Sequence, residues 1–345
     1  MRFLRYLLTL GILGLLVSFA WTLNHYAVGM LTRMLIIGLL AVSVALLTGV
    51  AGLPTLGQTA PFLVGAYTTA IMIDNDLSVG VVHLLASAGT GALFALITAP
   101  LVVYARGVVV LMITLALGEL TSTVAGRWKS LTHGTDGFTS WAPVHPLPGL
   151  VDLDTDASKY LYTLAVVAVL VGAVLLVLRT PAGALLRATR DDARRMRASG
   201  HPVNGYLTAA YVAAGALAGV AGALLFTVQS YVSPGDGGFD VAALILLAVV
   251  IGGSTSMVGA LIGAALVVAT RDWIAGAGHA PLLLGILFII CVYLLPNGLL
   301  GEHAALSFLN RLRPKPASVP PVPIPAPREP HPADEAAVPE RGAAR

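Results

Sequence analysis

The sequence predicts an all-α fold: a polytopic helix bundle integral to the membrane, with about ten spans and two regions where the apolar run is broken. Hydrophobic residues make up 57% of the chain and charged residues only 11%, and the mean hydropathy is +0.86. Together these values exclude an ordinary soluble globular protein. The apolar runs reach the roughly 20 residues that a helical span needs. They do not alternate polar and apolar residues, so a transmembrane β-barrel is also excluded.

The N-terminal half of the chain contains complete spans and one broken region. Residues 1–30 carry two arginines followed by an apolar run, and we expect them to form an uncleaved N-terminal membrane span. Residues 35–73 are too long for one span, because at 1.5 Å per residue they reach about twice the hydrocarbon thickness. Glycines and prolines between positions 49 and 61 predict a break in that region. Further spans are expected at residues 81–104 and 108–125.

The C-terminal half repeats this pattern after a polar, acidic connection at residues 126–159, which we expect on the outer face. Residues 241–270 carry no charge and are again too long for one upright span. The polar break Gly-Gly-Ser-Thr-Ser at residues 252–256 divides them. The remaining spans are expected at residues 160–178, 206–228 and 282–295.

Three parts follow from this organisation. Residues 1–30 are the N-terminal span, residues 31–300 form a transmembrane domain, and residues 301–345 are a tail rich in proline and alanine that cannot bury a core and is expected to be disordered. The basic residues that follow the last span favour the cytoplasmic side under the positive-inside rule. We therefore expect a multi-pass protein of the cell membrane with both termini in the cytoplasm.

Small residues recur at a spacing that lets helices approach closely. Gly215 and Gly219 are four residues apart with Gly222 one turn later, and Gly259 and Gly263 repeat the same spacing. This pattern is typical of helix packing in membranes.

One densely charged segment interrupts the apolar chain at residues 181–200. Pro181 suits the first turn of a helix and Gly200 suits its end, so the sequence predicts one helix of about five turns. Its arginines fall on one face by their spacing of three and four, and an aspartate within it supports the helix locally: Arg187, Arg190, Arg194, Arg197 and Asp191. Two interpretations are open. The arginines only keep this loop on the cytoplasmic side under the positive-inside rule, or the helix docks into a protein groove or on anionic lipid headgroups.

Glu119 is the exception in an otherwise apolar span, where a carboxylate is costly and should face a cavity or a partner. It lines a pathway or meets a substrate ammonium group, or it has a structural role, in which it pairs with Arg33, reaches to the membrane interface or is neutral. The sequence shows no phosphate-binding P-loop, no metal-ligand spacing among its eight histidines and no catalytic triad, and its positive charge lies in loops. We expect no enzyme active site, no metal, no cofactor and no nucleic-acid partner for this chain.

Four stretches in order resemble the LivM-type permease subunits of branched-chain amino acid ABC transporters. They are GLPTLGQTAPFLVGAYTTA, RGVVVLMITLALGEL with the following THGTDG loop, the segment from GALLRATRDDARRMRASGHP to VAGAL, and VVIGGSTSMVGALIGA. The third is the most specific. The resemblance covers about residues 31–300.

The resemblance implies a permease subunit of an ATP-driven importer for branched-chain amino acids. It implies a second, LivH-like permease subunit, two ATP-binding subunits that hold ATP and Mg, and an extracytoplasmic solute-binding protein. The basic segment would be the cytoplasmic coupling helix that contacts an ATPase, through Arg187, Arg190, Asp191, Asp192, Arg194, Arg197 and Gly200. The substrate pathway would include Thr55, Gly57, Gln58 and Glu119.

The first stretch departs from the family pattern, which leaves the substrate open. Pro54 stands where the family has leucine, Thr55 replaces serine, Gln58 replaces histidine and Pro61 replaces an aromatic residue. Glutamine forms hydrogen bonds but does not titrate near neutral pH. The alternatives are therefore an importer of the same class for urea or amides, or a proton-coupled secondary transporter in which Glu119 carries the proton.

Overall fold

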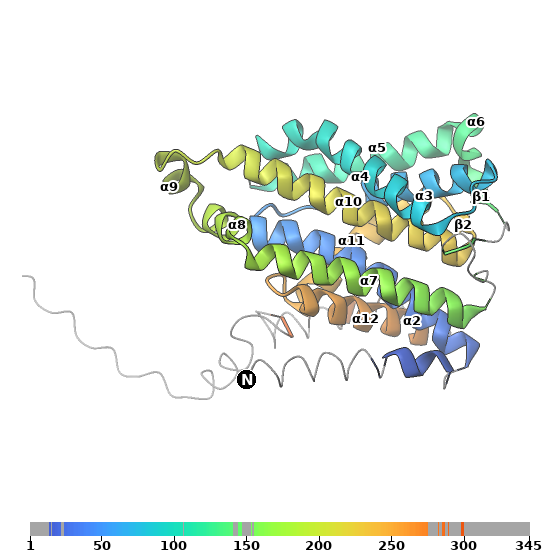
Figure 1. Ribbon diagram of the computed structural model, residues 1–345. Coiled ribbons are helices and arrows are strands. Elements are labelled where there is room, and N and C mark those ends of the chain that lie inside the picture. The colour runs from blue at the N-terminus through green and yellow to red at the C-terminus, as the bar shows by residue number, and fades with distance from the viewer. Residues whose placement is uncertain are drawn as a thin grey trace, which may run out of the picture. The chain divides into compact units, whose positions relative to one another are not determined.

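The computed structural model describes residues 24–105, 107–140, 144–146, 153 and 155–274, together with 14, 16–21, 282, 285–286, 289 and 298–299 (Figure 1). Most of the expected N-terminal span at 1–30 and of the last span at 282–295 lies outside these residues. The whole tail at 301–345 does so too. In the described part, the chain is helical almost throughout, as the sequence predicts.

The first broken region occurs where the sequence places it. Helix α2 covers His25–Ala45, a π-helical turn η1 covers Leu46–Ala51, and α3 begins after a short irregular segment and covers Thr59–Asp74. The boundary expected between residues 30 and 31 is wrong, because it falls inside α2. The helix accommodates Arg33 by pairing it with Asp272 at 3.6 Å, so the charge does not end the span.

The other predicted spans are found within a few residues of their expected bounds. Helices α4, α5, α7 and α10 cover Gly80–Val103, Val108–Arg127, Asp156–Arg179 and Val203–Gln229. The uncharged run at 241–270 is divided into α11 (Phe239–Gly252) and α12 (Met257–Ile274). Short elements complete the described part: α6 (Lys129–Thr132), η2 (Gly134–Asp136), β1 (Phe138–Thr139), β2 (Tyr231–Val232) and η3 (Pro234–Gly237).

Five of the described helices are long and apolar enough to cross a membrane: His25–Ala51 counted with its π-helical turn, and α4, α5, α7 and α10. Helix α11 is apolar but shorter. The chain is thus a multi-pass membrane protein, and the total of ten spans stays a prediction.

Helix α10 is the centre of the packing, and Figure 1 shows it between α4 and α5 on one side and α7 and α2 on the other. Its glycines make this possible. A Cβ atom on Gly219 would lie 2.2 Å from the carbonyl oxygen of Ser87 in α4, and one on Gly222 would lie 1.9 Å from that of Phe62 in α3. The Gly215, Gly219 and Gly222 pattern therefore marks a backbone-to-backbone crossing, as predicted.

The second glycine pair has the same role in the hairpin of α11 and α12. A Cβ atom on Gly259 would lie 2.3 Å from the carbonyl oxygen of Gly252, and one on Gly263 would lie 2.1 Å from that of Ala248. The two halves of the broken region at 241–270 thus pack directly on each other.

We predict that Gly219→Ala destabilises the protein by about 1–3 kcal/mol, because the added methyl group overpacks a contact made of backbone atoms. Thermal unfolding of the detergent-solubilised protein measures this. Gly172→Ala in α7 is the matched control, since no atom lies within 4 Å of the added group and alanine favours a helix by up to about 1 kcal/mol. Equal melting temperatures for the two variants would contradict the assignment of α10 as the close-packed centre.

Candidate functional site

The basic segment consists of two helices and not one. Helix α8 covers Pro181–Asp191, α9 covers Ala193–Ala198, and Asp192 between them has an extended backbone with φ −154° and ψ 91°. A carboxylate oxygen of Asp192 accepts hydrogen bonds from the backbone amides of Arg194 and Arg195, each at 3.0 Å. The single helix predicted for residues 181–200 is therefore wrong, because an aspartate that caps the next amides competes with continuation of the helix.

The two ends of the segment follow the sequence signals. Pro181 lies in the first turn of α8, and Gly200 after α9 has a φ of +82°, which favours glycine. Thr180 occupies the N-cap position, but its hydroxyl donates to the carbonyl oxygen of Val177 at 2.6 Å and does not cap α8.

Asp192 supports the segment, whereas Asp191 does not form the predicted pairs with the arginines. Asp192 lies 3.6 Å from Arg195, and Asp191 has no ion pair within the described part of the chain. The hydrogen bond from the amide of Arg195, then that of Arg194 and the two positive charges, lower the pKa of Asp192. Because its pKa is lowered, Asp192 stays ionised and caps α9 at neutral pH. The cap is lost only as the pH falls through the lowered pKa.

The break at Asp192 also separates the arginines that were expected to share one face. Arg187 donates through Nη2 to the carbonyl oxygen of Leu178 at 3.1 Å, at the end of α7. Arg197 donates to Oδ1 of Asn204 at 3.3 Å, at the start of α10. These two residues hold the basic segment to the spans that flank it.

Arg190 and Arg194 differ most in their surroundings. Arg190 turns toward the bundle and donates to the carbonyl oxygen of Gly49 in η1. Its side chain also packs on Gly52, where a Cβ atom would lie 2.9 Å from Cγ of Arg190. Arg194 is exposed and has no side-chain partner among the residues that the structure describes. One arginine therefore joins α8 to the broken region, and the other is free to meet a partner.

A polar cavity of about 400 Å³ separates α8 and α9 from the bundle. Both acidic and basic side chains line this cavity. The hydroxyl of Thr189 lines it too; it is buried and has no partner in the described part. The lining comes from the segment after η1, the junction of α4 and α5, and the basic helices: Ala51, Gly52, Leu53, Pro54, Val103, Ala105, Gly107, Val110, Thr189, Arg190, Asp191, Asp192, Ala193, Arg194, Arg197 and Leu207.

The two broken regions meet at Gly49. A Cβ atom on this residue would lie 1.7 Å from the carbonyl oxygen of Ser254 in the second break, so only glycine fits. Gly298 approaches Gly253 in the same way, and the amide of Leu299 donates to the carbonyl oxygen of Ile251 at 2.8 Å. Arg190 thus contacts the residue at which the two breaks touch.

Three of the four predicted pathway residues lie together just beyond this junction. The hydroxyl oxygen of Thr55 accepts from the amide of Gly57 at 3.1 Å, and the amide of Leu56 donates to the Thr114 hydroxyl oxygen at 3.2 Å. Gly57 packs on the backbone of Thr114. Gln58, 1% exposed, follows immediately.

Unpaired polar atoms cluster at this position. Both amide atoms of Gln58 and the hydroxyls of Thr59 and Thr48 are buried and have no hydrogen-bond partner among the described residues. Leaving a buried polar group unpaired costs about 1–3 kcal/mol. Such a cost is typical of a site that is completed by a ligand or by water, and a glutamine amide offers both donors and acceptors to it.

Glu119, the fourth predicted residue, lies apart from this cluster. It is exposed on α5, and its Oε1 accepts from the amide of Phe239 at 2.6 Å, at the N-terminus of α11. A carboxylate is favourable there because it satisfies a free amide and faces the positive end of the helix dipole. The pair with Arg33, one of the structural alternatives, does not form, since Arg33 lies by Asp272.

One face of α5 extends from the cluster past Gly118, the residue next to Glu119, and it was missed in the sequence. Thr114 contacts Gly57, a Cβ atom on Gly118 would lie 3.1 Å from Oγ1 of Thr59, and the hydroxyl of Ser122 donates to the carbonyl oxygen of Pro234 at 2.8 Å. The signal was available as three small or polar residues at intervals of four within an apolar span.

Within the described residues no group of three or more histidine, cysteine, aspartate or glutamate side chains is arranged to hold a metal ion. The described side chains at the break between the helices offer hydrogen bonds and charge.

Comparisons with known proteins agree with this architecture. Residues 26–295 match the family model of the permease component of branched-chain amino acid transport systems. The high-affinity branched-chain amino acid transport permease LivM of Escherichia coli is 26% identical over 318 residues, which covers 85% of this chain and 74% of that protein, and LivM of Salmonella typhimurium gives the same values. The probable permease LivH of Methanocaldococcus jannaschii is 28% identical over 235 residues, covering 65% and 72%. No solved structure matches the chain significantly.

We predict that Gln58→Leu raises the free energy of unfolding by about 1 kcal/mol or more, because it removes a buried amide that has no partner. Thr55→Val is the matched control and should lower stability, since the Thr55 hydroxyl accepts a backbone hydrogen bond. Thermal unfolding of both variants in detergent tests this. A Gln58→Leu variant as unstable as Thr55→Val would show that the amide is already paired in the resting protein.

Proposed function

Because the chain belongs to the family of branched-chain amino acid transport permeases, we propose that it is the membrane-spanning subunit of an ATP-driven importer for branched-chain amino acids. The chain itself is a permease and not an enzyme. Hydrolysis of ATP with Mg takes place on separate ATP-binding subunits, two per transporter, and a second LivH-like permease and an extracytoplasmic solute-binding protein complete the assembly.

The hydrogen bond from Arg190 to Gly49 is the observation that carries the coupling step. Helices α8 and α9 form the contact with an ATP-binding subunit, with the exposed Arg194 facing it. Arg190 transmits a movement of α8 to η1, where the two broken regions touch. Breaks of this kind are where rigid halves of a membrane transporter move against each other.

The substrate passes beside the cluster at Gln58. The unpaired amide of Gln58 and the hydroxyl of Thr59 offer hydrogen bonds to the amino acid's polar end, and the apolar bundle accommodates its aliphatic side chain. Glu119, connected through the Thr114 face of α5, attracts the ammonium group. An exposed carboxylate in a span needs a partner or a water-filled path, and the second permease subunit supplies the other wall of that path.

The charge distribution supports the orientation. Under the positive-inside rule, the arginines of α8 and α9 favour a cytoplasmic position for this end of the bundle, and we propose that both termini lie in the cytoplasm as well. The acidic connection at residues 126–159 then lies outside, where the solute-binding protein docks.

Uptake of radiolabelled leucine, valine, urea and acetamide by cells with and without this chain tests the function. We expect leucine and valine uptake to require the chain and to stop when ATP is depleted while the proton gradient is kept. If uptake depends on the proton gradient instead, the chain is a secondary transporter and not part of an ATP-driven importer. If only urea or acetamide is taken up, the substrate is an amide and not a branched-chain amino acid.

Variants of Arg194 and Arg190 separate docking from transmission. We expect Arg194→Glu to abolish co-purification of the ATP-binding subunit, because it reverses the free charge on the docking surface. Arg190→Ala should retain co-purification but lower uptake per ATP hydrolysed by about tenfold, since a charge-assisted hydrogen bond contributes about 1.5 kcal/mol or more.

Arg127→Glu is the control, because Arg127 is also exposed but ends α5 on the side expected to face outward. Unchanged ATPase co-purification in Arg194→Glu would remove α9 from the docking surface. Normal coupling in Arg190→Ala would show that the contact with Gly49 plays no part in transmission.

A further inference from the structure

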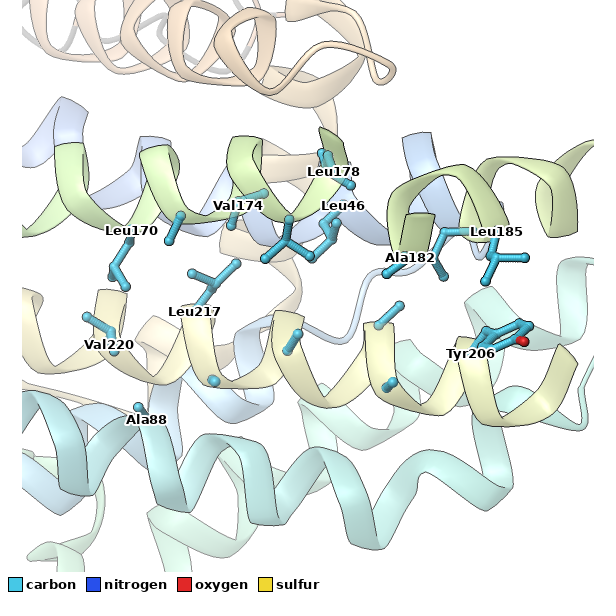
Figure 2. A pocket seen from close by; sticks show the side chains of 17 residues that line it. Leu46, Ala88, Leu170, Val174, Leu178, Ala182, Leu185, Tyr206, Leu217 and Val220 are labelled. Carbon is cyan, nitrogen blue, oxygen red and sulfur yellow. The ribbon is translucent and has the colours of Figure 1, made fainter. Parts of the chain in front are cut away.

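An apolar cavity of about 420 Å³ lies between α7, α8 and α10 (Figure 2). Leu170 and Val220 line one end, Leu178 and Leu217 line the middle, and Leu185 and Tyr206 line the other end. The hydroxyl of Tyr206 is the only side-chain polar atom among the residues that line it. Neither Gln58 nor the charged residues of α9 reach this cavity, so it is separate from the substrate path.

The cavity exists because α10 presents small side chains to it. Ala209, Ala213 and Ala216 recur at intervals of four and three along one side of α10, and the first two are exposed although most of the helix is buried. Helix α7 packs mainly on α2 and does not close this side. The groove therefore has two walls. Alanine methyl groups of α10 line one wall, and leucine and valine side chains line the other.

The length of the groove suits an acyl chain. Fourteen helical steps lead from Tyr206 to Val220 along α10, which is about 21 Å at 1.5 Å per residue. One leaflet of the hydrocarbon core is about 15 Å thick, so an acyl chain extended through one leaflet fits within the groove and matches its apolar lining.

A basic residue lies where α8 meets the end of α7, beside the groove. Helix α8 directs Leu185 and Leu186 to the cavity, while Arg187, the next residue, is exposed. Arg187 uses one hydrogen bond on the carbonyl oxygen of Leu178, which leaves four of its five N–H donors for an anion. An amphipathic helix with leucines on one side and arginines on the other is typical of the headgroup interface, where it attracts anionic lipid.

We propose that this groove binds one acyl chain of an anionic phospholipid, with the phosphate held by Arg187 beside the end of α7. The hydroxyl of Tyr206, which lines the groove, lies 3.2 Å from Nδ1 of His201. The lipid fills the space between α8 and α10 and packs against the leucines of α8 that line the groove. Its role in coupling rests on the proposed function, whereas the binding site itself does not.

Retention of lipid by the purified full chain tests the site. The protein is reconstituted in nanodiscs of phosphatidylglycerol and phosphatidylcholine, extracted in detergent, and examined by native mass spectrometry. We expect one phosphatidylglycerol to stay bound to the wild type. Ala213→Trp, which fills the groove, should lower this retention at least tenfold, whereas Val169→Trp on the exposed outer side of α7 should leave it unchanged.

The headgroup contact has its own variant and control. Arg187→Gln should abolish the preference for phosphatidylglycerol over phosphatidylcholine, and Arg195→Gln should keep it, since Arg195 pairs with Asp192 away from the groove. A phosphatidylglycerol with a photoreactive acyl chain should label residues 206–220 of the wild type, a result that does not depend on any variant folding.

Equal lipid retention in the wild type and Ala213→Trp, or photolabelling elsewhere, would overturn the proposal. Loss of an associated protein subunit in Ala213→Trp with no change in bound lipid would do so too, and would assign the groove to that subunit. Leucine uptake is measured separately: a chain that retains the lipid but imports no leucine contradicts the proposed function and not the lipid site.

Discussion

A helix can be interrupted inside a bilayer only where the backbone groups that it releases find other partners, and this constraint organises the structure. The chain is interrupted twice, after Ala45 and after Gly252, and the two interruptions lie against each other. Gly49 permits the contact because any side chain would overlap the carbonyl group of Ser254. The amide of Leu53 returns to the carbonyl oxygen of Leu47, and Arg190 donates to that of Gly49. The bundle around α10 keeps both breaks buried.

The same constraint explains why a charged helix outside the membrane is connected to the interior. A carbonyl group released at η1 needs a donor, and the nearest element with a long cationic side chain is α8. Because Arg190 of α8 donates to the carbonyl oxygen of Gly49, α8 is part of the junction. A displacement of α8 therefore changes this hydrogen bond. Arg194, three residues past the last residue of α8, makes no such contact and is exposed. The extended conformation of Asp192 is what gives the two arginines different directions.

The helices of the bundle could be predicted from the sequence because span length, apolar composition and glycine spacing are properties of single segments. The breaks at 46–58 and 253–256 were predictable for the same reason, since glycine and proline act locally. The failures concern pairs of segments. A helix through residues 181–200 satisfies spacing rules, but the carboxylate of Asp192 forms local bonds that spacing does not reveal. Glu119 was expected to face a cavity or a partner, with Arg33 as one alternative. It accepts a hydrogen bond from a backbone amide at the start of α11, a contact that is visible only when α5 and α11 are placed together. Residues 1–13 and 301–345 lie outside the described structure, so their predictions stand untested.

The buried amide of Gln58 distinguishes a structural break from a functional one. Thr55 and Thr114 pair with the backbone of the segment between η1 and α3, which is what stability requires of an interruption in a membrane. The side chains of Gln58 and Thr59, in the next turn, have no hydrogen-bond partner in the described structure although they are equally buried. Leucine and valine at these two positions would fill the same space without that cost. Polar groups that lower the stability of the resting fold are explained by hydrogen bonds that they form to a ligand. They lie between the junction that Arg190 contacts and the Thr114 face of α5, where a zwitterion passing through the bundle would accept and donate these hydrogen bonds.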